Sequence, residues 1–307
     1  WNTSNVTAMR DIFKLATSAN PDTSSWDTSN VRSMKNMFWG TNANPDVSGW
    51  DTSSVTTMYR MFYQATSANP DTSGWDVANV TNMSAIFNSS GISDANYSKF
   101  LIMAESTSSQ SSVDIGTAPG EYYANATTAR QALIDDHSWT ISDGGESDDF
   151  ASVWETTTED EEVTIPTTGT GYSYAIDWGD GTTETIASST SPSHTYEEAG
   201  EYTIAITGTF PRIYFNNTGD KTKITSIPNL GDVGWTSFSH AFYGCSNLSE
   251  IYGGETSNVT NMSYMFRDSS AVPDTSSWNT SNVTTMGSMF QGATSANPDT
   301  SSWDTSN

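Results

Sequence analysis

Large apolar residues recur along this 307-residue chain with a period of 24 or 25 positions, in two separate blocks. The first block carries Trp1, Trp26, Trp50 and Trp75, with Phe13, Phe38, Phe62 and Phe87 in step. The second block carries Phe242, Phe266 and Phe290, with Trp278 and Trp303. One apolar set per unit is typical of a solenoid, in which each unit buries its apolar face only against its neighbours. The pattern therefore predicts repeat solenoids in which the tryptophans form a column.

Within each unit, the spacing of the apolar residues predicts a short helix or helical turn. Val31, Met34, Met37 and Phe38 fall at i, i+3, i+6 and i+7, which lie on one helical face. An asparagine stands just before the valine, where the N-cap of a helix accepts a hydrogen bond from a free amide. The asparagines at this position are Asn5, Asn30, Asn79, Asn258 and Asn282. "NPD" marks a turn, and "TSSWDT" predicts one short strand per unit of a parallel ladder.

The period is lost after Phe87, and residues from about 91 to 145 are expected to close the first solenoid, which spans 1–145. "ANYSKFLIMAES" and "TTARQALIDDH" predict helices, whereas "SVDIG" and "SWTISDGG" predict short strands. A closing segment is needed because the last unit would otherwise expose its apolar face.

Hydrophobicity then alternates with a period of two over residues 146–210. An acidic stretch at the start predicts a linker that ends in a strand. "YSYAIDW", "TETIA", "HTY" and "EYTIAIT" follow between turns and predict a small β-sandwich. A second solenoid is expected over 211–307. Residues 1–30 and 278–307 agree at 24 positions, so we hypothesise a larger period of 277 residues and expect the polypeptide to continue beyond both ends.

Two family resemblances rest on these segments. "AFYGCSNLSEI", "TSNVTNMSYMF" and "SSWDTSNVTTM" resemble BspA-like leucine-rich-repeat surface proteins, although Trp, Met and Phe stand where Leu is usual. "YAIDWGDGTTET" followed by "HTYEEAGEYTIAITG" resembles the PKD-like domain, an immunoglobulin-type β-sandwich. The resemblances imply a bacterial secreted or surface protein, with a PKD-like module between two leucine-rich-repeat-like solenoids.

The charge balance is strongly acidic, with 36 Asp and Glu against 11 Lys and Arg and a formal net charge of −25. Such a surface repels phosphate, so we expect no nucleic-acid partner, and no apolar run is long enough to insert this segment into a membrane. The single cysteine, Cys245, excludes an internal disulfide framework and predicts a buried apolar thiol.

The sequence contains no recognisable catalytic motif. His137, His194 and His240 lie in three different predicted regions and lack metal-ligand spacing. The repeated aspartates recur with the period of the repeats, which a catalytic acid does not do. An enzyme that uses a pair of carboxylates nevertheless stays open as a rival interpretation. Asp177 and Asp180 in "DWGDGT" are candidate calcium ligands, but the same spacing makes a tight turn, which we favour.

We therefore predict a non-enzymatic, extracellular structural or adhesive protein that forms part of a tandem-repeat fibre and needs no cofactor. Basic residues gather in the Val-to-Phe half of the unit and aspartates in the other half, which is compatible either with simple solubility or with self-association. The alternative is a glycan-binding accessory module of a secreted polysaccharide-degrading protein. That alternative predicts contact through aromatic residues outside the repeated core positions, Trp39, Tyr59 and Tyr63.

Overall fold

A computed structural model of the chain describes residues 1–306. It contains two compact units, Trp1–Ser147 and a second that begins at Asp148. Each unit has its own hydrophobic core. The sequence instead predicts three segments, and the difference arises because the sandwich and the second repeat block share one core.

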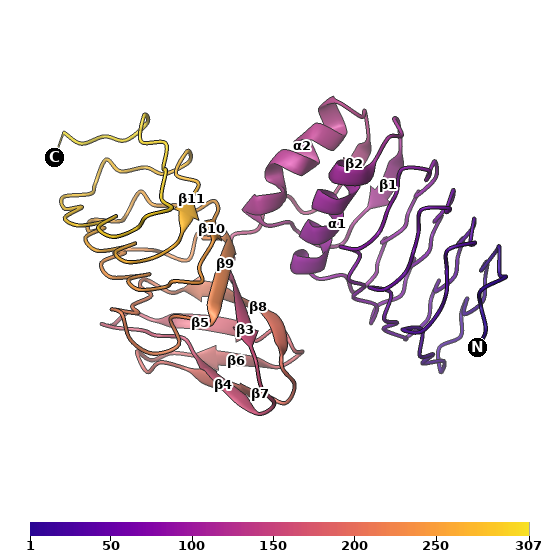
Figure 1. The fold of residues 1–307 in the computed structure, drawn as a ribbon, viewed down its shortest axis with the longest axis horizontal. Helices are drawn as coiled ribbons and strands as arrows, with labels where there is room; N and C mark the ends of the chain where they lie inside the picture. The colour runs from indigo at the N-terminus through magenta and orange to yellow at the C-terminus, as the bar shows by residue number, and fades with distance from the viewer. Residues whose placement is uncertain (307) are drawn as a thin grey trace. The chain divides into compact units, whose positions relative to one another are not determined.

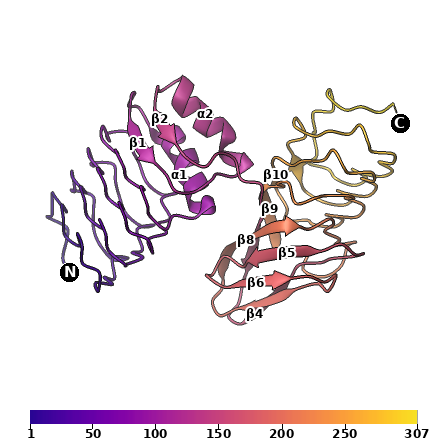
Figure 2. The ribbon, with the colours of Figure 1, turned by 180° about the vertical axis from the view of Figure 1, so that it is seen from behind.

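Successive repeats of unit 1 stack on one another through their backbones, which lie in layers in Figure 1 and, from behind, in Figure 2. Parallel bridges connect equivalent residues of neighbouring repeats: Ala8, Ser33, Thr57 and Asn82. After Ala8, Ser33 and Thr57, every second amide donates to a carbonyl of the next repeat. In the first repeat, the amides of Met9, Asp11, Phe13 and Leu15 donate to the carbonyls of Ser33, Lys35, Met37 and Trp39. The backbone polar groups of one repeat are thus satisfied by the next one.

The residues expected to form a short helix or helical turn in each repeat within residues 1–306 form turns, such as the one closed by the amide of Met37 and the carbonyl of Met34, and no regular helix. Asn36 and Arg60, at equivalent positions, have φ of 56° and 53°. A left-handed residue interrupts a right-handed helix, and the alternate amides bond to the next repeat instead of to their own turn. This conformation still points Met34, Met37 and Phe38 inward, so the apolar spacing alone does not distinguish it from a helix.

The N-cap role predicted for Asn30, Asn79 and Asn282 is also wrong, because their side chains donate hydrogen bonds where a cap would accept one. The Nδ2 groups of Asn30, Asn79 and Asn282 donate to carbonyls of the preceding repeat, on Ser4, Ser53 and Ser257, over 2.7–2.8 Å. Asn258 holds the same place in the sequence and is exposed. Asn30, Asn79 and Asn282 therefore link repeats to one another.

The strand expected over "TSSWDT" is replaced by two turns. The amide of Trp26 donates to the carbonyl of Thr23, and that of Val31 to the carbonyl of Thr28. The bridge position lies further along, at Ser33. Threonine hydroxyls provide the lateral connection here, since Oγ1 of Thr28 donates to the carbonyl of Asp51 in the next repeat over 2.9 Å.

The repeated aromatic residues form columns inside the stack. The rings of Trp26 and Trp50 lie 6.1 Å apart and 3° from parallel, and those of Phe38 and Phe62 lie 5.5 Å apart and 4° from parallel. Further stacked pairs are Trp1–Trp26, Phe13–Phe38, Phe62–Phe87, Phe242–Phe266, Phe266–Phe290 and Trp278–Trp303. Trp75 is buried, and its indole N–H donates to the carbonyl of Val47 over 3.0 Å. Each stacked pair contributes about 0.5–1.5 kcal/mol beyond its buried area.

The last part of unit 1 covers the final repeat, and the helices and strands predicted there are confirmed. They are α1 Asp94–Thr107, β1 Asp114–Thr117, the 3-10 helix η1 Ala124–Ala126, α2 Thr127–Asp135 and β2 Thr140–Ser142. Ser93 caps α1 by accepting from the amide of Asn96. Phe100 of α1 packs edge-on against Phe87, 5.0 Å between centroids, so the helix closes the phenylalanine column.

Unit 2 begins with a β-sandwich whose predicted strands are confirmed. They are β4 Glu161–Thr164, β5 Ser173–Asp177, β6 Thr183–Ile186, β7 Ser193–Tyr196 and β8 Gly200–Thr209. An additional strand, β3 Phe150–Thr156, lies where the sequence predicts a linker, and it is almost wholly buried. Strand β4 pairs with β7, while β3 pairs antiparallel with β8.

The sheet continues from the sandwich into the second repeat block. Strand β9 Ile224–Asn229 pairs antiparallel with β3, and its Asn229 lies opposite Ala151. Strands β10 Glu250–Ile251 and β11 Val272–Pro273 extend the sheet in parallel, one from each following repeat. The resulting order is β11-β10-β9-β3-β8-β5-β6. The sheet and core therefore cross the boundary that the sequence predicts at 210/211.

Candidate functional site

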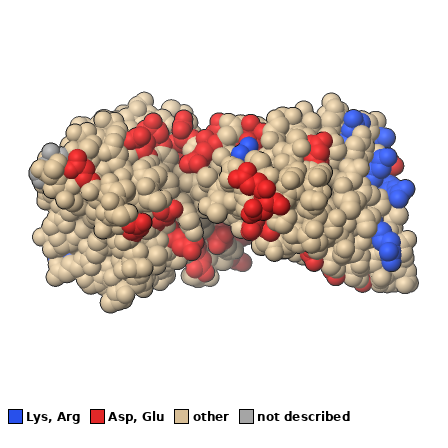
Figure 3. Space-filling model, turned by 90° about the horizontal axis from the view of Figure 1, so that it is seen from above, with Lys and Arg blue, Asp and Glu red and all other residues tan. Residues whose placement is uncertain are grey.

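Charged side chains are unevenly distributed over the surface. In Figure 3, Lys and Arg gather at the end where unit 1 begins, while most of the other charged groups in this view are Asp and Glu. Five of the 11 basic residues belong to the first three repeats: Arg10, Lys14, Arg32, Lys35 and Arg60.

The repeated aspartates stabilise turns. Oδ1 of Asp22 accepts hydrogen bonds from the amide and hydroxyl of Ser24, over 3.1 and 2.7 Å. The same pattern recurs at Asp27, Asp46 and Asp51. The hydroxyl bond from Ser24, followed by the amide bond, lowers the pKa of Asp22. Periodic carboxylates are thus accounted for by the scaffold, as the sequence predicts.

The most distinctive surface feature is a group of basic and aromatic side chains, which we call the cationic–aromatic face. Its members, on the outside of the first three repeats, are Lys14, Lys35, Trp39, Tyr59, Arg60 and Tyr63. Nζ of Lys14 lies 4.3 Å from the ring centre of Trp39, and Nζ of Lys35 lies 5.3 Å from that of Tyr59. The rings of Trp39 and Tyr63 meet edge to face at 5.4 Å. All three aromatic side chains are half-buried.

Arg60 is the centre of this face. Its guanidinium carbon lies 4.9 Å from the ring centre of Tyr63, 5.0 Å from that of Tyr59 and 5.3 Å from that of Trp39. Its Nε is buried without a hydrogen-bond partner, and within residues 1–306 the guanidinium has no carboxylate partner. The rings therefore hold this cation in place by cation–π contact, and its charge is left uncompensated.

One carboxylate, that of Asp11, lies beside this face. It accepts from Nδ2 of Asn36 over 2.9 Å and lies 3.5 Å from Nζ of Lys14. The hydrogen bond from Asn36, and to a lesser degree the charge of Lys14, lowers the pKa of Asp11. The face thus keeps a net positive charge.

A smaller cluster of the same kind occupies the second repeat block. The guanidinium of Arg267 lies 5.2 Å from the ring centre of Tyr243 and 5.5 Å from that of Tyr264. Here the cation has a partner, since its Nε lies 3.6 Å from Asp268. His240 stacks on Tyr264, and burial together with the charge of Arg267 lowers the pKa of its imidazole.

Asp177 and Asp180, the candidate calcium ligands, both form turn hydrogen bonds. Oδ1 of Asp177 accepts from the amide of Gly179, and Oδ1 of Asp180 accepts from the amide and hydroxyl of Thr182. Oδ2 of Asp180 lies 2.7 Å from Nε2 of His194. In the described part of the chain, His, Cys, Asp and Glu nowhere form a group of three that could hold a metal ion. Calcium binding stays a prediction without support from this geometry.

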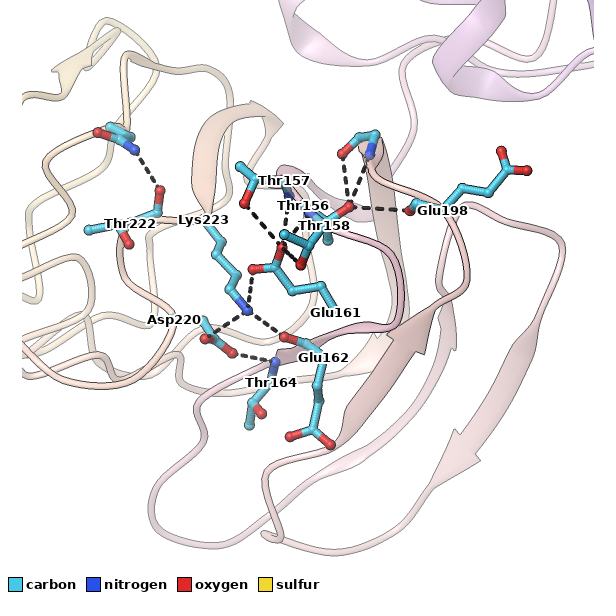
Figure 4. Close-up of polar contacts among 12 residues, drawn as sticks. Thr156, Thr157, Thr158, Glu161, Glu162, Thr164, Glu198, Asp220, Thr222 and Lys223 are labelled. Carbon is cyan, nitrogen blue, oxygen red and sulfur yellow. Dashed lines mark hydrogen bonds and ion pairs between the residues drawn. The ribbon is translucent and has the colours of Figure 1, made fainter.

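A further charge cluster stabilises the junction between the sandwich and the second repeat block. Figure 4 shows Lys223 reaching toward both Glu161 and Asp220, over 3.0 and 3.2 Å. The amide of Thr157 donates to Glu161 over 2.7 Å. This amide bond, and then the hydrogen bond from Lys223, lower the pKa of Glu161 to about 2. Lys223 precedes β9, so its ion pair with Glu161 ties the start of β4 to the first strand of the repeat block.

The remaining candidates lie in the core or outside any site. Cys245 is buried, and burial raises the pKa of its thiol. Neither α1 nor α2, nor any other helix within residues 1–306, is long and apolar enough to cross a membrane.

The sequence singled out Trp39, Tyr59 and Tyr63 but not the cations that cover them. The available signal was that Lys14 holds the same position of its repeat as Trp39 and Tyr63, and Lys35 the same position as Tyr59. Only the stacking register shows which cation meets which ring.

Comparison with known proteins gives two family matches. Comparisons with curated proteins and with solved structures gave no match. Residues 151–212 match the PKD domain, which is typical of extracellular proteins. Residues 1–100 and 236–307, more than half of the chain, match the family described as Mycoplasma protein of unknown function, DUF285. The two matched segments flank the PKD domain and coincide with the two blocks of stacked repeats, and the chain therefore belongs to the DUF285 family.

Proposed function

We propose that this chain is a non-enzymatic structural and adhesive segment of an extracellular or cell-surface protein. In this proposal two leucine-rich-repeat-like solenoids, similar to those of BspA-like proteins, flank the PKD domain and present repeated surface to other copies or to cell-surface partners. The PKD match supports the extracellular location.

The stacking geometry is the observation that carries the proposal. Each repeat donates its alternate amides to the next one and continues the aromatic columns, so every added repeat extends the structure by the same step. A stack of this kind repeats its surface groups at regular intervals, and weak contacts repeated along an array give high avidity.

Sedimentation velocity tests the self-association part of the proposal. The purified chain is examined at increasing concentration, with and without calcium, and preparations are inspected for fibres by electron microscopy. Growth of the sedimentation coefficient with concentration is expected. A chain that stays monomeric up to millimolar concentration and forms no fibres would overturn self-association.

Protease treatment of intact source cells tests the location. Peptides from residues 1–306 released without lysis are expected for a surface segment. Release only after lysis would contradict the proposed location.

The alternative, a glycan-binding accessory module, is favoured by one specific observation: Trp39, Tyr59 and Tyr63 come together on one face. A screen of the whole chain on immobilised glycans tests it, and the absence of any bound glycan would remove this alternative.

A further inference from the structure

The cationic–aromatic face holds three cations on three successive repeats. Lys14 belongs to the first repeat, Lys35 to the second and Arg60 to the third. Equivalent aromatic rings of these repeats, Phe13, Phe38 and Phe62, follow each other at 5.5 Å. The cations hold different positions within their repeats, and shared rings bring them together: Lys14 and Arg60 both contact Trp39, and Lys35 and Arg60 both contact Tyr59. A linear polymer that crosses the three repeats can therefore meet all of them.

The positions of the cations favour a negatively charged ligand. Lys14 covers the ring of Trp39, and Arg60 lies among the rings of Trp39, Tyr59 and Tyr63. A neutral sugar that stacked on these ring faces would have to displace the cations. An acidic group instead meets a guanidinium that is already held in place, and a planar guanidinium binds carboxylate or sulfate through two parallel hydrogen bonds.

The rings favour a saccharide over a simple anion. Trp39, Tyr59 and Tyr63 remain half-buried, so part of each ring stays at the surface beside the cations. Sugar rings carry apolar C–H groups that pack on such surfaces, while their acidic substituents reach the neighbouring cations. A polymer with both features matches the composition of this face.

We propose that the cationic–aromatic face binds a linear acidic polysaccharide, whose carboxylate or sulfate groups meet Lys14, Lys35 and Arg60 and whose sugar rings contact the parts of Trp39 and Tyr63 that the cations leave uncovered. The proposal deepens the adhesive role proposed above by naming the class of ligand, and it rests on that role only for the extracellular location.

A second copy of the chain fits this face less well. The exposed acidic positions of unit 1, such as Asp22 and Asp46, stand among Ser and Thr side chains that form the same turns. Those positions offer the rings of the cationic–aromatic face no apolar partner. A duplex nucleic acid fits less well again, because it is broad and would meet the surrounding acidic surface of a chain with net charge −25.

The test uses the whole chain and three immobilised polymers of similar length: polygalacturonate for carboxylate, dextran sulfate for sulfate, and dextran as the neutral control. Binding is measured by biolayer interferometry at physiological salt and again at raised salt. We expect binding to at least one acidic polymer, weakening as salt rises, and none to dextran. The acidic polymer that binds more tightly identifies the acidic group.

Charge variants locate the site. Arg60→Gln is expected to weaken binding about tenfold or more, because it removes the held guanidinium. Lys14→Gln is expected to weaken it less, and it keeps the test valid if Arg60→Gln is poorly folded. Arg32→Gln is the matched control, because Arg32 is an exposed cation of the second repeat outside this face. Circular dichroism and thermal melting confirm that each variant is folded.

Three results would overturn the proposal: no binding to either acidic polymer, equal binding to dextran, or an equal loss for Arg32→Gln and Arg60→Gln. If neither polymer binds and Arg60→Gln abolishes self-association, the face is a contact between copies and the proposal fails. A chain that remains monomeric yet binds an acidic polymer contradicts only the self-association part of the proposed function.

Discussion

Replacing one ring of the phenylalanine column by an aliphatic side chain tests whether the repeats are coupled through their aromatic core. Phe62 is fully buried and stacks on Phe38 at 5.5 Å and on Phe87 at 6.0 Å. Phe62→Leu keeps most of the apolar volume but removes both stacked pairs. At about 0.5–1.5 kcal/mol per pair, the free energy of unfolding of unit 1 is expected to fall by about 2 kcal/mol.

Phe13→Leu is the matched control, because Phe13 occupies the same position of the first repeat and is only partly buried. It also stacks on Phe38, at 5.5 Å, but it has less buried surface to lose. The expected loss is about 1 kcal/mol. Hydrogen exchange by mass spectrometry measures the effect locally, and for Phe62→Leu faster exchange is expected in the repeats on both sides. Equal losses for the two variants, or faster exchange confined to one repeat, would refute coupling through the column.

Three further substitutions test separate features. Asn79→Asp removes a side-chain donor to the preceding repeat, so it should lower the free energy of unfolding by about 1 kcal/mol and the melting temperature with it. An unchanged melting temperature would favour a helix cap, because aspartate also caps helices. Gly91→Ala would place a Cβ 2.3 Å from the carbonyl oxygen of Thr66. Urea titration should therefore show that the free energy of unfolding falls by about 1–3 kcal/mol. An unchanged free energy would mean that the backbones at Gly91 and Thr66 are further apart. The pKa of Glu161 is about 2 in the folded protein against 4.5 ordinarily, so its contribution is present above about pH 4.5 and is lost as the pH falls toward 2. Lys223→Met should therefore destabilise unit 2 by up to about 1 kcal/mol at pH 7, and by less near pH 3. Urea titrations at both pH values measure this, and a difference independent of pH would contradict the ion pair.

The apolar pattern predicts which side chains are inside the repeats better than it predicts their backbone. Met34, Met37 and Phe38 are buried as expected, yet they do not form a helix. Arg60 adopts a left-handed conformation that its residue type rarely adopts, where its own amide and that of Phe62 bond to the next repeat. Local propensity does not contain that interaction, because the partner lies about one period away in the sequence.

In the sandwich, too, interactions between residues distant in sequence determine structure that the local pattern does not predict. Strands β5 to β8 are predictable from alternation, whereas β3 is concealed by the acidic residues on both sides of it. Its burial depends on β8 and on β9, which follow it by tens of residues. Similarly, the cationic–aromatic face depends on register: Lys14 and Trp39 are far apart in sequence and meet only because consecutive repeats align.

The pairing of β3 with β9 determines how the chain carries a pulling force. The polypeptide enters unit 2 at the start of β3 and leaves the pair at the end of β9, and Ala151 and Asn229 lie opposite each other at that same end. Tension along the chain therefore separates this pair one hydrogen bond at a time and does not shear the whole ladder at once. The first bonds to be loaded are those from Nδ2 of Asn229 to the carbonyl of Asp149 and from the amide of Asp232 to the carbonyl of Asp148. Under mechanical load, we therefore expect the sandwich to begin separating from the repeats at these two hydrogen bonds.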